Sequence, residues 1–314
     1  MPHIPVDEAT RNLLACEAFI RRASQLGLPF MLKGSYLTRQ YFPNPADRIP
    51  EDVDWLCLER FDSGGAARAL FSRWVTQVTE LPPDDGVAFT SFRQNDFWRG
   101  IDYAMADDFP TVNTDLDYCL GEYCDDIVRL DISFNLPMDL PSEPLLYRPL
   151  QGEPFVVAHA TPLALQVAWK LHQTLVRPRF KDLIDLLHLV RHAGFTPAVR
   201  ERALAALRQE CRADNTDVGR LRYLLAGNLA PLLANLGPYD QQWSWWRNTG
   251  SMAGSFGCPL PATQADLEQQ LRTAFALAGF DASQLPELVA ARQPGQVSEA
   301  KRTRLERLRD LLGG

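Results

Sequence analysis

This chain of 314 residues has no Cys-x-x-Cys motif, no long apolar run and no excess of basic residues. None of its six cysteines forms a Cys-x-x-Cys pair, so the spacing typical of zinc sites is absent. No apolar run approaches about 20 residues, the length that a membrane helix needs. The first ten residues lack the basic and apolar regions of a secretory signal. We therefore expect a cytoplasmic protein that does not span a membrane.

The cysteines themselves are expected to be buried free thiols in a reducing compartment. Cys119 and Cys124 flank the sequence of a hairpin turn. We expect this pair, like the other four cysteines, to be unbonded.

The formal net charge is −7, whereas a general nucleic-acid binder is more often basic. A specific RNA substrate is still compatible with this charge, because charge can be local. The stretch from Lys170 to Arg191 contains five basic residues. The alternative interpretation of this stretch is a solvated helix face.

The hydrophobic content of 46% predicts a globular protein, and the length favours two domains. Up to residue 160, helical periodicity alternates with short strand patterns, which predicts an α/β domain. The proline-rich segment 137–154 is interpreted as a connector. After residue 160 the pattern becomes helical, and we expect helices at 162–176, 179–193, 197–212, 217–235, 263–278 and 298–312.

Three aspartates are the candidate catalytic carboxylates. Asp52 and Asp54 lie two residues apart in an apolar strand, so they share one face of that strand. Asp131 lies on the more polar face of another strand, 126–134. Carboxylates this close repel one another, and a divalent cation between them would explain their presence. The alternative is an edge strand with solvated aspartates.

A strand followed by Gly34-Ser35 and a helix is a candidate phosphate site. Glycine allows a close approach, and a helix N-terminus offers free N–H groups. Such turns are common in proteins, so this feature alone is weak.

These motifs together carry a family resemblance. The sequence PFMLKGSYLTRQYF…RIPEDVDWLCL resembles the nucleotidyltransferase motif of the polymerase β superfamily, and more specifically that of the AbiEii/AbiGii toxin family, which includes the MenT-like toxins. Lys33-Gly34-Ser35 stands in the place of the family's strand-ending motif. Arg48 lies four residues before Asp52-Val53-Asp54, as in the family.

A second signature lies in WKLHQTLVRPRFKDLIDLLHL, which is similar to the family's helix with a lysine followed by a basic-Asp-x-x-Asp-Leu helix. The resemblance implies that Lys170 contacts the triphosphate and that Asp182 helps to position it. It implies nucleotide binding by Lys33, Gly34, Ser35, Arg48 and also Asp185. The alternative for Lys170 and Asp182 is a structural salt bridge.

The fold implied by the resemblance is α+β. A polymerase β-like nucleotidyltransferase domain with a mixed sheet (residues 1–158) would precede a helical domain (residues 159–314) that completes the NTP site. Two Mg²⁺ ions, or Mn²⁺ in their place, would be held by Asp52, Asp54 and Asp131 about 4 Å apart.

The activity implied by the resemblance is transfer of a nucleotide from an NTP to an acceptor hydroxyl. The most plausible acceptor is the 3′ end of tRNA, and transfer to it would block translation. A cognate antitoxin would silence the protein. Two alternatives stay open: a small-molecule or protein nucleotidyltransferase with the same site, and a non-catalytic binding module. The low net charge favours a small acceptor, and the three carboxylates argue against the binding module.

Two further patterns are interpreted as packing. His188 and His192 are spaced as metal ligands could be, but no HExxH pattern joins them. Trp243, Trp245 and Trp246 could stack on bases or bind an antitoxin, although such clusters more often pack a core.

Overall fold

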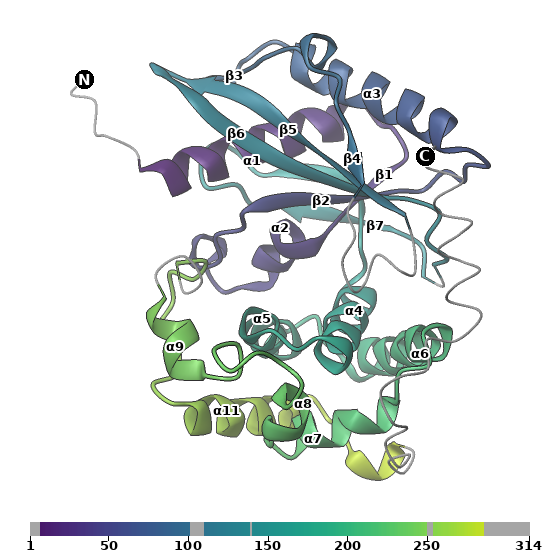
Figure 1. Ribbon diagram of the computed structural model, residues 1–314, viewed down its shortest axis with the longest axis vertical. Helices are drawn as coiled ribbons and strands as arrows, with labels where there is room; N and C mark the ends of the chain where they lie inside the picture. The colour runs from purple at the N-terminus through teal and green to yellow at the C-terminus, as the bar shows by residue number, and fades with distance from the viewer. Residues whose placement is uncertain (1–6, 101–109, 139, 250–253, 286–314) are drawn as a thin grey trace.

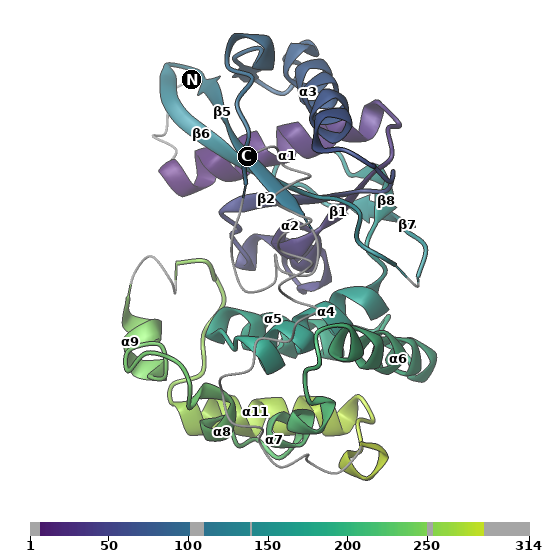
Figure 2. The same ribbon diagram turned by 45° about the vertical axis from the view of Figure 1, so that its right-hand side comes forward.

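The computed structural model describes residues 7–100, 110–138, 140–249 and 254–285. The helix expected at 298–312 lies outside the described residues. Figure 1 shows a twisted sheet above a layer of helices, and Figure 2 shows the same two layers after a turn of 45° about the vertical axis. The predicted fold class, α+β with a mixed sheet followed by helices, is confirmed.

The strands form one sheet in the order β3-β5-β6-β2-β1-β8-β7, and β4 pairs with β5 at one edge. The pairs β1–β8 and β2–β6 are parallel, and the other pairs are antiparallel. The strands are β1 (Phe30–Lys33), β2 (Asp52–Cys57), β3 (Val87–Phe89), β4 (Arg99–Gly100), β5 (Thr111–Leu120), β6 (Tyr123–Ser133), β7 (Glu143–Tyr147) and β8 (Phe155–Ala160).

The helices flank this sheet unequally. On one face α1 and α3 pack against the strands, whereas α2 lies on the other face, toward the helical layer (Figures 1 and 2). The α-helices are α1 (Glu8–Gln25), α2 (Gly34–Thr38), α3 (Gly64–Glu80), α4 (Leu163–Val176), α5 (Phe180–Arg191), α6 (Pro197–Ala213), α7 (Leu221–Leu225), α8 (Ala230–Leu233), α9 (Trp243–Asn248) and α11 (Gln264–Leu277).

Two hydrophobic cores follow from this arrangement. The first lies between the sheet and α1 and α3, where Phe30 stacks on Trp74 at 3.7 Å between ring centroids. The second lies among the helices after residue 162 and includes Trp243 and Trp246, so the packing interpretation of these two tryptophans is confirmed. The sequence-based domain boundary at 158/159 stays a prediction, and we propose that the two domains correspond to these two cores.

Aromatic contacts join the two layers. Phe42, from the segment that follows α2, belongs to the helical core and stacks on His188 at 3.8 Å between ring centroids. Tyr41 meets the ring of His192 edge-on. Both histidines therefore have packing partners, as the sequence interpretation expected.

Two secondary-structure predictions are wrong. The segment taken as a connector contains β7, because its residues pair antiparallel with β8 despite the surrounding prolines. The helix expected at 217–235 is two short helices, α7 and α8, because Gly227 takes a positive φ of 64° between them.

The prediction of free thiols is also wrong for one pair. Cys119 and Cys124 form a disulfide, because the tight turn between β5 and β6 brings their Cα atoms to 4.0 Å. Cys16, Cys57 and Cys211 are free and buried, as expected. Within the described ranges, no helix is both long and apolar enough to cross a bilayer.

A buried ion pair ties the first helix to the edge of the sheet and to the segment after α2. The Arg39 guanidinium contacts the Glu17 carboxylate, and the Tyr147 hydroxyl donates to the same carboxylate at 3.2 Å. Arg39 Nε also donates to the Pro45 carbonyl at 3.0 Å, which holds the loop that leads to Arg48.

We predict that Glu17→Ala lowers the free energy of unfolding by about 3–5 kcal/mol, because the buried Arg39 loses its carboxylate partner. Urea unfolding measures this change. Glu8→Ala, at an exposed position of the same helix, is the control and should change stability by less than about 1 kcal/mol. Equal losses in the two variants would contradict the role given to the buried pair.

Candidate active site

The turn between β1 and α2 allows only glycine at its centre. Gly34 has a φ of 72°, and a Cβ added to it would lie 2.0 Å from Asp54 Oδ2. Its carbonyl accepts hydrogen bonds from Gln166 Nε2 at 2.9 Å and Thr38 Oγ1 at 3.0 Å. The turn therefore lies directly against Asp54 of β2 and is hydrogen-bonded to α4.

We predict that Gly34→Ala abolishes activity and destabilises the fold, because the methyl group clashes with Asp54 and the left-handed backbone is strained. Gly65→Ala is the matched control, since nothing lies within 4 Å of a Cβ at that helical position. Thermal unfolding and a transfer assay on both variants check this. An active, stable Gly34→Ala protein would contradict the geometry.

The three predicted carboxylates share one face of neighbouring strands. In the parallel pairing of β2 with β6, Asp54 lies opposite Asp131, and Asp52 lies two residues before Asp54. The alternate residues of β2, Val53 and Trp55, are buried in the sheet core. The core thus determines which way the strand faces, and the aspartates point toward the helical layer.

Burial and mutual repulsion disfavour ionisation of this cluster. Burial, followed by the charges of Asp54 and Asp52, raises the pKa of Asp131 to about 7. Burial and the charge of Asp54 also raise the pKa of Asp52. The Lys33 ammonium lies 3.2 Å from Asp54 Oδ1 and supplies part of the missing positive charge.

The donor chemistry fits a divalent cation. Three carboxylates on one face, two of them with raised pKa values, offer hard oxygen ligands and an uncompensated negative potential. The cluster is not closed around a centre: over the described part of the chain, no three His, Cys, Asp or Glu side chains converge on a common metal position. Asp54 is engaged by Lys33.

We predict a pH-dependent gain in stability for Asp131→Asn in EDTA. An ordinary Asp has a pKa of 3.8, so between that value and about 7 the folded protein holds a proton that the unfolded chain releases. Wild-type stability therefore falls as pH rises through this window, and the variant removes that loss.

The variant's melting temperature should exceed that of the wild type by more at pH 8 than at pH 5. The control is Asp117→Asn, at an exposed position of the neighbouring strand β5. Its melting temperature should differ from that of the wild type by the same amount at pH 5 and at pH 8. A pH-independent shift for Asp131→Asn would contradict the assignment.

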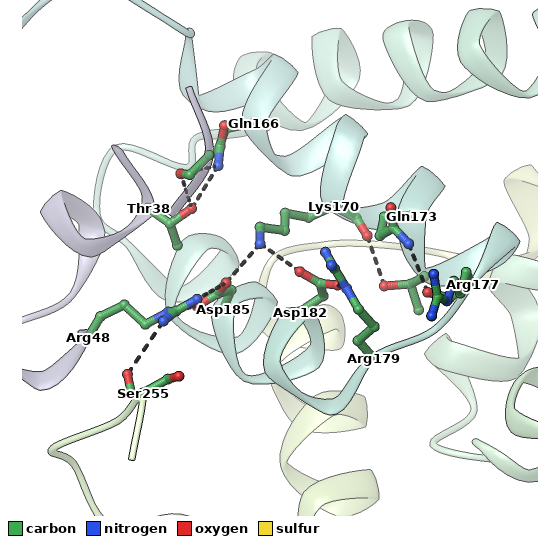
Figure 3. Close-up of polar contacts among 12 residues, drawn as sticks. Thr38, Arg48, Gln166, Lys170, Gln173, Arg177, Arg179, Asp182, Asp185 and Ser255 are labelled. Atoms are coloured by element: carbon green, nitrogen blue, oxygen red, sulfur yellow. Dashed lines mark hydrogen bonds and ion pairs between the residues drawn. The ribbon is translucent and has the colours of Figure 1, made fainter. Parts of the chain in front are cut away.

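An ion-pair network centred on two buried aspartates lies on the helical side of the site (Figure 3). Lys170 Nζ on α4 donates to Asp182 Oδ1 at 2.6 Å and to Asp185 Oδ2 at 2.8 Å. Arg179 donates from Nε to Asp182 Oδ2 at 2.6 Å, and Arg48 donates from Nε to Asp185 Oδ1 at 2.8 Å. Both aspartates are fully buried, at 0% exposure.

The charges in this network hold one another in the ionised state. Burial opposes ionisation of Asp182, yet Lys170 and Arg179 lower the pKa of its carboxyl. Burial likewise opposes ionisation of Asp185, whose pKa is lowered by Arg48 and Lys170. The two carboxylates in turn raise the pKa of Lys170 against the effect of burial. Three cations against two carboxylates leave the network one unit positive.

The carboxylate face and the ion-pair network line one cleft of about 400 Å³. The sheet and the start of α2 contribute Lys33, Gly34, Ser35, Asp52, Asp54 and Asp131 to the cleft. Arg48, Lys170 and Asp182 lie on the opposite wall. Nine of the ten residues singled out from the sequence are thus brought together. Asp185 is not on the cleft wall, because it lies behind Arg48 and Lys170.

Lys181 and Gln166 are among the cleft residues to which sequence reasoning gave no role. Lys181 is the basic residue before Asp182, and burial together with the charge of Arg179 lowers the pKa of its amine. Gln166 lies one helical turn before Lys170 and fastens the Gly34 turn. The spacing of 166 and 170 on one helix face was the available signal for Gln166.

Residues 18–284 match the family model described as "Nucleotidyl transferase AbiEii toxin, Type IV TA system". The chain belongs to the AbiEii family. It is therefore a nucleotidyltransferase of the toxin–antitoxin class, as the motif resemblance predicted.

A solved structure has a similar fold. The AbiEii-family chain is similar in fold to MenT4, the nucleotidyltransferase toxin Rv2826c from Mycobacterium tuberculosis H37Rv, with a TM-score of 0.53 and 18% identity. The similarity covers 88% of this chain and 86% of that one. At this identity the likeness concerns the fold alone. No curated protein gives a match to the sequence.

Proposed function

We propose that the protein transfers a nucleoside monophosphate from an NTP to the 3′ end of tRNA, and thereby blocks translation until a cognate antitoxin silences it. One observation carries the proposal: the three carboxylates of β2 and β6 face the cationic wall of α4 and α5 across a single cleft. A polyphosphate needs positive charge around its oxygens, and in-line transfer needs positioning and charge neutralisation.

Asp52, Asp54 and Asp131 would hold the divalent metal ions, Mg²⁺ or Mn²⁺. When bound, these ions would lower the pKa of the attacking hydroxyl and neutralise charge on the triphosphate. The nearby Lys33 ammonium would exchange its contact with Asp54 for contacts with phosphate oxygens. The absence of a side chain at Gly34 keeps the turn close to Asp54, with Ser35 beside it on the cleft wall.

The helical wall would bind the departing pyrophosphate. Lys170 supplies a charged ammonium, because Asp182 and Asp185 raise its pKa against the effect of burial. Asp182 and Asp185 then act as positioning residues, and Arg48 Nε donates to Asp185 Oδ1 at 2.8 Å. Lys181 has no carboxylate within 4.0 Å among the described residues, so its ammonium is available to the triphosphate.

Local charge supports a nucleic-acid acceptor in spite of the acidic chain. Arg177 and Arg179 lie at the cleft and are exposed, with 44% of the Arg179 side chain accessible. Phosphates of an RNA end could contact both residues. The family description names a toxin of a toxin–antitoxin system, and translation is a target that such a transfer would stop.

A transfer assay tests the proposal. The purified protein would be incubated with Mg²⁺, total tRNA and each α-³²P-labelled NTP in turn. Label on tRNA should appear with the wild type, vanish in EDTA, and fall at least about 1,000-fold in Asp52→Ala/Asp54→Ala, because the metal ligands are lost.

Asp117→Ala is the control for an exposed aspartate on a neighbouring strand and should keep wild-type activity. Label on tRNA that survives in the double variant would refute the assigned site. Folded protein that labels no tRNA with any of the four NTPs would refute the tRNA acceptor and favour a small-molecule or protein acceptor.

A further inference from the structure

Part of the cleft wall is formed by α4 and carries chemistry different from that of the carboxylates. Along α4, Gln166, Lys170 and Gln173 recur at helical spacing and line the cleft wall, with Trp169 beside them. Leu136, which follows β6, lines the cleft as well. The polyphosphate and metal roles proposed above use none of Leu136, Trp169 and Gln173.

Trp169 is held as a rigid, partly exposed ring. Its indole Nε1 donates to Glu210 Oε1 on α6 at 2.9 Å, so the ring plane is fixed by two helices. Trp243 and Trp246 are buried in the helical core, at 2% and 7% exposure, whereas Trp169 keeps part of its surface in the cleft. A fixed indole face beside a polyphosphate site is suited to stacking on a nucleobase.

The amide of Gln173 is oriented by its own hydrogen bond. Its Nε2 donates to the Arg177 carbonyl at 2.9 Å (Figure 3), and because a carbonyl can only accept, the nitrogen must face Arg177. The amide oxygen is therefore an acceptor with no protein partner in the described parts of the chain. Gln173 lies one helical turn beyond Trp169.

We propose that this part of the cleft is a nucleobase site, in which Trp169 stacks on the base and Leu136 supplies a further apolar contact. Gln173 Oε1 would accept a hydrogen bond from an N–H group on the edge of the base. The inference rests on the proposed nucleotidyl transfer. The base belongs either to the incoming NTP or to the terminal nucleotide of the acceptor, and both present the same chemistry.

Binding to the full chain in Mg²⁺ tests the site without any turnover. The probes are ATP, CTP, GTP, UTP and inorganic tripolyphosphate, which has the phosphates but no base. If the base is that of the NTP, Trp169→Leu should raise the Kd of the favoured NTP about tenfold and leave that of tripolyphosphate unchanged. Trp169→Phe should restore most of the affinity, since phenylalanine also stacks.

If the base is that of the acceptor, NTP binding stays unchanged in Trp169→Leu, and the KM for tRNA in the transfer assay rises instead. Gln173→Leu should narrow the difference in Kd or KM between bases. Trp245→Leu, a half-buried tryptophan of α9 that does not line the cleft, is the control.

The proposal would be overturned if Trp169→Leu weakens the binding of tripolyphosphate as much as that of NTPs. It would also be overturned if the variant changes neither the Kd of any NTP nor the KM for tRNA. If Trp169→Leu does not fold, Gln173→Leu carries the test: unchanged differences in Kd and KM between the bases would then overturn the proposal. Base-dependent binding through Trp169 with no transfer to any acceptor would refute the proposed reaction and retain the base site.

Discussion

The contact of Lys170 with two fully buried carboxylates is the interaction on which the site depends. Burying a charge is costly unless it is paired and hydrogen-bonded, so Asp182 and Asp185 can lie at 0% exposure only because cations surround them. Each aspartate has a further cation, Arg179 or Arg48, on its other oxygen. The removal of either aspartate would raise the excess positive charge of the network from one unit to two.

The same network determines how the two layers meet. Arg48 comes from the loop before β2, Lys170 from α4, and the Ser255 carbonyl accepts hydrogen bonds from Arg48 Nη1 at 3.4 Å and from the Ile49 N–H at 2.8 Å (Figure 3). Segments from both halves of the chain thus meet at one ion cluster. The cluster places a positive wall opposite the carboxylates, and burial followed by mutual repulsion raises the pKa of Asp52 and of Asp131.

Local patterns predicted much of this arrangement. The period of two in β2 and β6 placed Asp52, Asp54 and Asp131 correctly on polar faces, because the buried alternate residues leave no other choice. The Lys170 and Asp182 motif could be found because its spacing on two helices is characteristic. β7 was missed because proline-rich sequence conceals strand pairing, which depends on β8 as its partner.

Other features could not be predicted from one sequence, because they depend on residues far apart in the chain. The contact of Arg48 with Asp185 spans 137 positions, and the burial of Asp185 behind the cleft wall follows from that contact. The hydrogen bond from Trp169 to Glu210 spans 41 positions. The Cys119–Cys124 disulfide was missed for a different reason: the hairpin was recognised, but the composition favoured free thiols.

A crystal structure with Mn²⁺ and a non-hydrolysable NTP analogue tests the central claim most directly. The account predicts anomalous manganese density against Asp52, Asp54 and Asp131, with the triphosphate between that density and Lys170. Triphosphate bound elsewhere, or manganese that contacts none of the three aspartates, would contradict it.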